Sequence, residues 1–232
     1  MSTLLECKGL FKSYSGRPAL KNVNLAIESG HIVGLLGPNG SGKTTLIKLI
    51  NGLLTPTQGE LYINQNPVGV ESKKIVSYLP DHTYLDMNLK VRDIISYFMD
   101  FYEDFDEKKA YDMLSKLRIN PGDKLNTMSK GTKEKVQLIL VMSRRAKLYV
   151  LDEPIAGVDP AARDYILDII LSNYEEDATI LISTHLIADI ENILDQVIFL
   201  KHGEISLISS VDDIRSGQGK SVDALFREVF RC

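Results

Sequence analysis

HIVGLLGPNGSGKTTLIKLI (31–50) contains the pattern that decides the fold. The apolar run over 31–36 predicts a buried strand, and a helix with its apolar residues on one face is expected to begin near Gly42. Between them, GPNGSGKT (37–44) fits the pattern G-x-x-x-x-G-K-[ST]. Its glycines allow backbone N–H groups to converge on phosphate oxygens, and the helix N-terminus adds positive partial charge. This stretch therefore predicts a phosphate-binding site between a strand and a helix.

The side chains of this loop have separate expected roles. Lys43 would hold the β- and γ-phosphates of a nucleotide, and Thr44 would offer its hydroxyl to Mg²⁺. The residues expected to contact the nucleotide here are Gly37, Pro38, Asn39, Gly40, Ser41, Gly42, Lys43, Thr44 and Thr45. The alternative is a glycine-rich turn that binds nothing.

A second motif, KLYVLDEP (147–154), places two carboxylates after an apolar strand. The carboxyl ends of parallel strands are where such sheets bind ligands. Asp152 is expected to anchor Mg²⁺, directly or through water, and Glu153 to act as a general base on the attacking water. The alternative is a solvated acidic turn. Because the guanine-reading pattern N-K-x-D is absent, the two motifs favour an ATPase over a GTPase.

The composition is that of an ordinary globular protein. The 232 residues are 44% hydrophobic and 25% charged, with a net charge of −4. This balance excludes disorder along most of the chain and disfavours a general nucleic-acid binder. No apolar run approaches the roughly 18 residues that span a bilayer. Two cysteines are too few for a disulfide framework, and no secretory signal is visible, so the chain is expected to be cytosolic.

Two kinds of pattern divide the chain. Residues 1–85 and 143–232 carry short apolar runs with helices between them, which predicts an α/β core with a mostly parallel sheet. Residues 86–142 have helical periodicity and few glycines, and are expected to form a helical insert in that core. Within it, the acidic run EDFDE (103–107) is expected to be solvated. Near the end, SGQGK (216–220) is expected to be a flexible loop.

A third motif, MSKGT (128–132), lies shortly before the second carboxylate motif. With the other two in this order, the chain resembles the nucleotide-binding subunit of ATP-binding cassette (ABC) transporters, whose signature is L-S-G-G-Q. The resemblance covers nearly the whole chain. It implies one ABC ATPase domain over 1–232, in which a P-loop NTPase core carries an N-terminal antiparallel β subdomain and a helical insert. It also implies ATP and Mg²⁺ as the bound groups.

The resemblance assigns the signature residues to the nucleotide of a second subunit. Ser129, Lys130 and Gly131 would hold the γ-phosphate bound by the other member of a head-to-tail dimer. Ser129 also fits as the N-cap of the helix that follows. Lys130 stands where the family has a glycine, and Thr132 where it has the glutamine. Whether the Lys130 charge faces phosphate or solvent stays open at this point.

Two positions follow the second motif in family order. Asp159, in AGVD (156–159), would contact the partner subunit, or cap the helix that starts at Pro160, or both. His185 follows the apolar strand ATILIS and would be the switch histidine, catalytic together with Glu153 and Lys43. A lone histidine is more often structural, and the placement after this strand favours the functional interpretation.

Two positions earlier in the chain also match. Tyr14 would stack on adenine, or else pack at a strand end. Asp81 stands where the family has a glutamine that touches Mg²⁺. An aspartate can ligate the metal through oxygen, although it is shorter and charged. The alternative is a turn residue after Pro80 that never reaches the metal.

The resemblance further implies partners and location. A second nucleotide-binding subunit, self or paralogue, and a separate transmembrane permease would complete a transporter, without nucleic acid. The chain would be cytoplasmic, peripheral on the inner face of the cell membrane, and similar to the compact subunits of small exporters. The alternative is a soluble ABC-type ATPase in cofactor assembly or another non-transport role. Aromatic residues at helical spacing predict either a packed face of the insert or a docking surface for a membrane partner: Tyr97, Phe98, Phe101, Tyr102 and Phe105.

Overall fold

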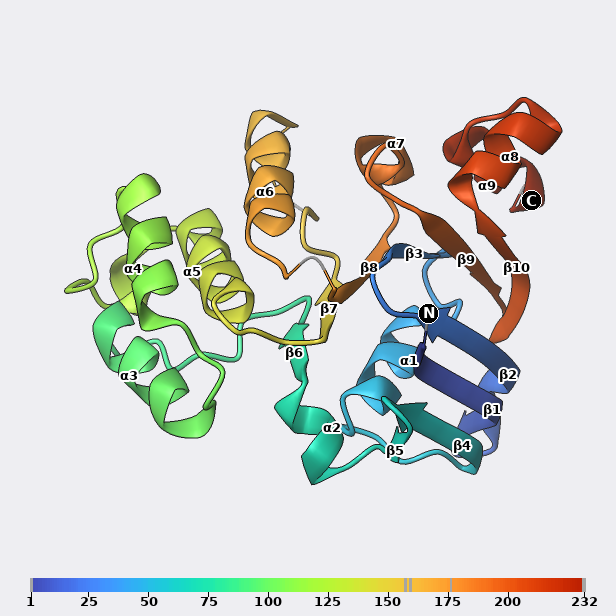
Figure 1. The fold of residues 1–232 in the computed structure, drawn as a ribbon, viewed down its shortest axis with the longest axis horizontal. Helices are drawn as coiled ribbons and strands as arrows, with labels where there is room; N and C mark the ends of the chain where they lie inside the picture. Colours follow the sequence, from blue (N-terminus) through green and yellow to red (C-terminus); the bar gives the residue numbers. More distant parts are fainter. Residues whose placement is uncertain (1, 157, 159, 176, 231–232) are drawn as a thin grey trace.

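The computed structural model describes residues 2–156, 158, 160–175 and 177–230. A central sheet lies between two layers (Figure 1). One layer is formed by α6, α7, α8 and α9, and the other by α1 and a second, antiparallel sheet; α3, α4 and α5 form a helical block beside β6. The strands are β1 Thr3–Tyr14, β2 Arg17–Glu28, β3 Ile32–Leu36, β4 Gln58–Ile63, β5 Asn66–Pro67, β6 Val76–Leu79, β7 Leu148–Asp152, β8 Thr179–Thr184, β9 Gln196–Lys201 and β10 Glu204–Ser210. The helices are α1 Lys43–Ile50, α2 Val70–Lys74, α3 Val91–Phe101, α4 Glu107–Lys116, the 3₁₀ helix η1 Leu125–Thr127, α5 Lys130–Met142, α6 Pro160–Ser172, α7 Ile187–Ile190, α8 Val211–Gln218 and α9 Val222–Val229.

The central sheet has the strand order β10-β9-β3-β8-β7-β6. Its pairs from β9 to β6 are parallel, and only β10 joins antiparallel within the described residues. Because β3, β7 and β8 are neighbours and parallel, their carboxyl ends meet at one edge. There, Leu36 is the register partner of Thr184, and Asp152 that of Ser183. The predicted motifs are therefore brought together at this edge, as expected for such sheets.

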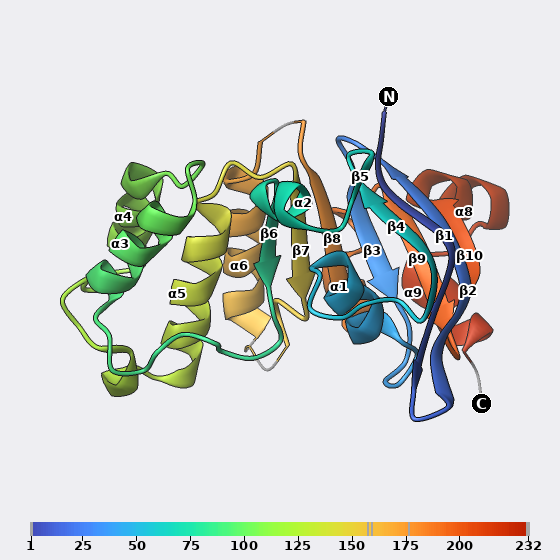
Figure 2. The same ribbon diagram turned by 90° about the horizontal axis from the view of Figure 1, so that it is seen from below.

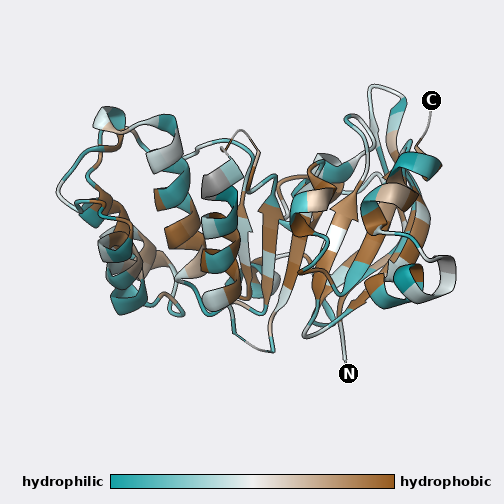
Figure 3. Cartoon of the chain, turned by 90° about the horizontal axis from the view of Figure 1, so that it is seen from above, coloured by the Kyte–Doolittle hydropathy of each residue, from teal (hydrophilic) through white to brown (hydrophobic). Residues whose placement is uncertain are grey.

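The phosphate-loop helix is held between the two sheets. Leu46, Ile47, Leu49 and Ile50 of α1 are buried in one cluster with residues of β1, β2 and β4 and with one face of the central sheet. The antiparallel sheet has the order β2-β1-β4-β5. In Figure 3 the strands of the central sheet are hydrophobic, whereas the outer faces of the flanking helices are hydrophilic. Burial of these apolar residues holds α1 between the two sheets.

The middle of the chain is helical, as predicted, and Figure 2 shows α3, α4 and α5 beyond β6 at one end of the molecule. The prediction that EDFDE (103–107) is solvated is wrong for two of its carboxylates. Asp104 accepts two hydrogen bonds from the buried Arg144, from Nε at 2.9 Å and from Nη2 at 3.1 Å. Asp106 caps α4 by accepting from the Lys109 N–H at 3.0 Å. The Asp104 contact ties the helical block to the core, whereas the Asp106 contact stabilises the first turn of α4.

Arg144 connects segments that are far apart in the sequence, and no local sequence pattern predicts this connection. Its guanidinium also donates to the backbone carbonyls of Val76 at 2.5 Å and Lys74 at 2.6 Å, and lies 3.9 Å from the Tyr102 ring centroid. It therefore joins β6 to the loop after α3. A buried arginine needs such partners because desolvating its charge alone is strongly unfavourable.

The C-terminal part differs from expectation at one place. SGQGK (216–220), expected to be a loop, is helical through Gln218, since α8 ends only at Gly219 with φ 61°. Ser210 caps this helix, and Val211 and Ile214 are buried against the central sheet. Packing of these apolar residues outweighs the low helix propensity of Ser216 and Gly217. Among the described residues, no helix is both long and apolar enough to cross a bilayer.

Candidate nucleotide and metal site

The phosphate loop runs from the end of β3 to the start of α1. Gly42 precedes α1 with φ 111°, and a Cβ atom there would lie 2.7 Å from the Ala19 carbonyl oxygen. Only glycine fits this left-handed, crowded position. Pro38, Asn39 and Gly40 are exposed, so the turn of the loop is open to a ligand. The loop therefore has the form that the motif predicts.

Lys43 lies inside this loop. It is 7% exposed, and its Nζ donates to the carbonyl oxygens of Gly37 at 2.7 Å and Pro38 at 3.3 Å. Burial lowers the pKa of Lys43, while the carboxylates of Glu153 and Asp152 oppose this shift. The ammonium group is thus held where the loop curves, in the electrostatic field of both motif carboxylates.

Asp152 is buried at the end of β7. The Ser183 hydroxyl donates to its Oδ1 at 2.5 Å, whereas its Oδ2 has no hydrogen-bond partner among the described residues. Burial raises the pKa of the Asp152 carboxyl, and the nearby Asp81 and Glu153 carboxylates raise it further; the Ser183 hydrogen bond and Lys43 act in the opposite direction. One buried carboxylate oxygen is therefore free for a cation.

Glu153 has an unusual backbone. Its φ is 53°, in the left-handed region, and its N–H donates to the Ser183 carbonyl at 3.0 Å and to the Ser183 hydroxyl at 3.2 Å. Non-glycine residues held in this region occur preferentially at functional sites. Its Oε2 lies 2.9 Å from Nδ1 of His185, which follows β8. The structure thus brings together the predicted general base and the predicted switch histidine.

Asp81 follows β6 and Pro80. It lies with Asp152 and Glu153 in the lining of one cleft of about 410 Å³, and its Oδ1 is 2.6 Å from Nδ1 of His82. The carboxylate therefore faces the same cleft as the second motif. His82, for which the sequence shows no partner, forms an ion-pair contact with it when protonated.

The donor set fits a magnesium ion better than a metal held by protein alone. Among the described residues, no cluster of three or more His, Cys, Asp or Glu side chains could hold a metal. Mg²⁺ is commonly bound through one or two carboxylates together with substrate phosphates and water. The free Oδ2 of Asp152 and the half-buried Thr44 at the start of α1 suit that mode.

The signature residues are not beside the phosphate loop of the same chain. Ser129 caps α5, where its Oγ accepts from the Thr132 N–H at 3.2 Å, and Gly131 is exposed in the first turn. Figure 2 shows α5 on the far side of β6 and β7 from α1. The Lys130 side chain is 85% exposed and only 3.8 Å from Glu134, so its charge faces solvent.

Two predicted site residues remain, Tyr14 and Asp159. Tyr14, at the end of β1, is 44% exposed, and the Lys12 ammonium lies 5.5 Å from its ring centroid. Its ring is thus available for stacking. Asp159 lies outside the described residues.

Ser183 is a site residue that the sequence prediction missed. It holds both Asp152 and the backbone of Glu153. The available signal was a hydroxyl residue near the carboxyl end of the apolar strand ATILIS, which pairs with the strand before the carboxylates.

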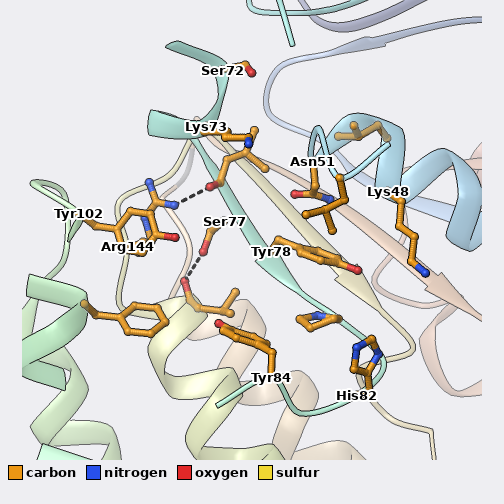
Figure 4. A pocket seen from close by; sticks show the side chains of 16 residues that line it. Lys48, Asn51, Ser72, Lys73, Ser77, Tyr78, His82, Tyr84, Tyr102 and Arg144 are labelled. Atoms are coloured by element: carbon orange, nitrogen blue, oxygen red, sulfur yellow. Dashed lines mark hydrogen bonds between the residues drawn. The ribbon is translucent and has the colours of Figure 1, made fainter. Parts of the chain in front are cut away.

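A second hollow separates the core from the helical block, and we call it the core–insert groove. It encloses about 530 Å³ and lies among α1, α2, β6 and the loop after α3 (Figure 4). Its lining includes three tyrosines, Tyr78, Tyr84 and Tyr102, while Lys48 and Lys73 contribute cations. Beside it, Tyr97 and Phe101 are 58% and 72% exposed and stack with ring centroids 5.6 Å apart. The predicted aromatic face therefore divides, because Phe98 and Phe105 pack against the core and the half-buried Tyr102 packs on Phe98.

The fold and this site define a P-loop ATPase of the ATP-binding cassette class. The family model described as ABC transporter matches residues 20–156, and the chain belongs to that family. This confirms the predicted family, fold class and ATPase activity.

Several known proteins are similar over most of their length. The ABC-type transporter ATP-binding protein EcsA of Bacillus subtilis is 31% identical over 240 residues, covering 98% of this chain and 96% of that protein. The ABC transporter ATP-binding protein YtrB of the same organism is 30% identical, covering 91% and 74%. A solved ATP-binding subunit of an ABC transporter superposes with a TM-score of 0.89 at 30% identity, covering 99% and 100%. The cassette MJ0796 was solved as a dimer bound to ADP and Pi in a post-hydrolysis state. It superposes with a TM-score of 0.78 at 25% identity, covering 89% of this chain and 98% of that chain.

Proposed function

We propose that this chain hydrolyses ATP to drive transport through a separate membrane-spanning chain. The observation that carries the proposal is the arrangement of Asp152, Glu153 and His185 at the sheet edge, together with Lys43 in the phosphate loop. The relatives named as transporter ATP-binding proteins support the same function. The chain acts as one domain, with a core formed by residues 1–85 and 143–232 and an insert formed by 86–142.

The residues at this edge have complementary roles in hydrolysis. The backbone N–H groups of residues 37–45 and the Lys43 ammonium bind the phosphates of ATP. Glu153 orients water and accepts its proton, and His185 holds the Glu153 carboxylate from 2.9 Å. Tyr14 stacks on adenine.

Thr44, Asp152 and Asp81 would hold Mg²⁺. When bound, Mg²⁺ neutralises negative charge on the phosphates. Burial and the neighbouring carboxylates raise the pKa of Asp152 and so disfavour its ionised form, and a bound cation would relieve this cost.

Two copies, or one copy and a paralogue, close head to tail on ATP. Ser129, Lys130 and Gly131 lie at the exposed N-terminus of α5, a position suited to an anion brought by a second molecule. The dimeric state of the neighbour MJ0796 supports this assembly. Asp159 adds a contact between subunits. ATP binding closes the dimer, and hydrolysis releases it.

The membrane-spanning partner docks at the core–insert groove. Its tyrosines, with the exposed Tyr97 and Phe101 beside it, form an apolar and aromatic surface of the kind that marks interaction sites. Asp81 and Tyr84 belong to the loop that connects the cleft to this groove, so a change at the ATP site reaches the partner over a short path. The protein is then cytoplasmic and peripheral on the inner face of the membrane.

The experiment is affinity purification of this chain from native membranes, with mass spectrometry of the proteins that accompany it. A multi-spanning protein in near-equal amount supports the transport function. Recovery of soluble assembly proteins alone would contradict it and favour a soluble ATPase, with the ATP site unchanged. The variant Phe101→Ser should reduce recovery of the membrane protein and leave basal ATPase activity at the wild-type level.

A further inference from the structure

Gln137 is a buried polar side chain in the apolar half of α5. It is 3% exposed and stands in VQLILVM (136–142), where the other residues are apolar and buried. A carboxamide at such a position needs partners, because burying it without hydrogen bonds is unfavourable. Its surroundings therefore indicate why this residue type is present.

The carboxamide holds the backbone on both sides of Asp81. Nε2 donates to the carbonyl oxygens of Pro80 and His82, each at 3.4 Å. The orientation of the amide is set by these two acceptors, because a flipped group would direct Oε1 at two carbonyl oxygens. Both contacts are longer than an ordinary N–H···O hydrogen bond, so each one is weak.

Stability alone does not account for Gln137. Its Oε1 is buried and has no hydrogen-bond partner among the described residues, which is a destabilising arrangement. The connection between α5 and β6 is already made by Ser77, whose hydroxyl donates to the Val141 carbonyl at 2.9 Å. An apolar residue at position 137 would preserve that connection without an unsatisfied acceptor.

The position of Gln137 links two parts of the molecule. It lines the 410 Å³ cleft together with Asp81, Asp152 and Glu153. It also lies seven residues after Lys130, on the same face of α5, and both residues line this cleft. Through this carboxamide, the helix that begins with the signature residues contacts the segment of Asp81.

We propose that Gln137 is a positioning residue that sets the place of Asp81, and with it the position of this carboxylate in the proposed metal site. The inference rests on the proposed metal role of Asp81. Gln137 acts through the Pro80 and His82 carbonyls and does not itself touch nucleotide or metal.

The test compares Gln137→Met, which keeps length and removes the donor, with Asp81→Ala and with the double variant. Gln137→Leu serves as a second apolar replacement. Ser77→Ala is the matched control, since it removes another buried hydrogen bond between β6 and α5 that does not involve Asp81. The readouts are Mn²⁺ affinity by EPR in the presence of a non-hydrolysable ATP analogue, the Mg²⁺ dependence of ATP hydrolysis, and Tm.

The expected result is about tenfold weaker Mn²⁺ binding in Gln137→Met, with no further weakening when it is added to Asp81→Ala. Ser77→Ala should lower Tm without changing metal affinity. Wild-type metal affinity in both Gln137 variants, or effects of Gln137→Met and Asp81→Ala that multiply, would overturn the inference alone. Wild-type metal affinity in Asp81→Ala would overturn both the metal role of Asp81 and the inference that depends on it.

Discussion

The Nδ1 atom of His185 lies 2.9 Å from Oε2 of Glu153, and this contact joins the ends of two neighbouring strands. The two residues are 32 positions apart in the chain. They meet because β7 and β8 pair in parallel, with Asp152 opposite Ser183. Strand order, rather than any local sequence pattern, therefore brings together the proposed general base and the histidine that holds its carboxylate.

Glu153→Gln should separate ATP binding from hydrolysis. The amide keeps the shape of the side chain but cannot accept a proton from water, so the hydrolysis rate should fall by about 10² to 10⁴. ATP affinity should stay within a fewfold of wild type, because Lys43 and the loop amides are untouched. Phosphate release and nucleotide titration measure the two quantities.

The same variant tests the assembly. With hydrolysis blocked, it should accumulate as a closed dimer with ATP, seen by light scattering after gel filtration. The exposed Glu107→Gln should behave as wild type in both assays. A Glu153→Gln protein that stays monomeric with ATP at high concentration would show that a different second subunit is needed.

Asp152→Asn should stabilise the fold while abolishing activity. The raised pKa of this buried carboxyl means that its ionised form is disfavoured in the folded state, so ionisation destabilises the protein as pH rises through the folded pKa. Each 1 kcal/mol gained should raise Tm by roughly 2–4 °C for a chain of this length. The gain should be largest near pH 7 and shrink toward acid pH, where wild-type Asp152 becomes protonated.

Thermal melts of both proteins across this pH range measure the effect in the absence of nucleotide and Mg²⁺. The exposed Asp112→Asn is the control for a surface carboxylate, and its Tm difference should be close to zero. A Tm gain for Asp152→Asn that grows toward acid pH would contradict the sign of this argument.

The sequence predicts those parts of the site that depend on neighbouring residues. The phosphate loop, the strand before Asp152 and the cap at Ser129 each follow from a short pattern, and the family follows from their order. Ser183 and Gln137 could not be identified in this way, because each acts on a segment far away in the sequence. The acidic run 103–107 shows the same limit, since the partner of Asp104 lies 40 residues later at Arg144. The error at 216–220 has a different cause, because tertiary packing of α8 overrode local propensity.

Arg144→Ala should destabilise the protein by about 3–5 kcal/mol. The change leaves Asp104 and the carbonyls of Val76 and Lys74 without their donor. Arg144→Lys should recover part of this loss, because it keeps the positive charge. The recovery should be incomplete, because an ammonium group cannot form the two-pronged contact with Asp104. Chemical denaturation gives the free energies of unfolding. Arg145→Ala, which removes an exposed ion pair with Asp106, should lower the free energy of unfolding far less than Arg144→Ala does.

Gly131→Ala should impair hydrolysis without harming the fold. An added Cβ atom there meets nothing within 4 Å, and alanine favours a helix over glycine by up to about 1 kcal/mol. In the proposed dimer, however, the methyl group faces the γ-phosphate of the partner's ATP, so hydrolysis should fall by at least about tenfold. Gly217→Ala on α8 is the matched control, because its Cβ also meets nothing within 4 Å and it lies away from the site.

Mixing subunits decides whether Gly131 acts across the dimer. A Lys43→Ala subunit lacks a working phosphate loop but keeps an intact signature, whereas Gly131→Ala has the reverse defect. In a mixed dimer, one site combines the intact loop of one subunit with the intact signature of the other. An equal mixture should therefore recover up to about a quarter of wild-type activity, since half of the dimers are mixed and each has one complete site. If Gly131 acted within its own subunit, every site with an intact phosphate loop would still carry the Gly131 defect, and mixing would restore nothing.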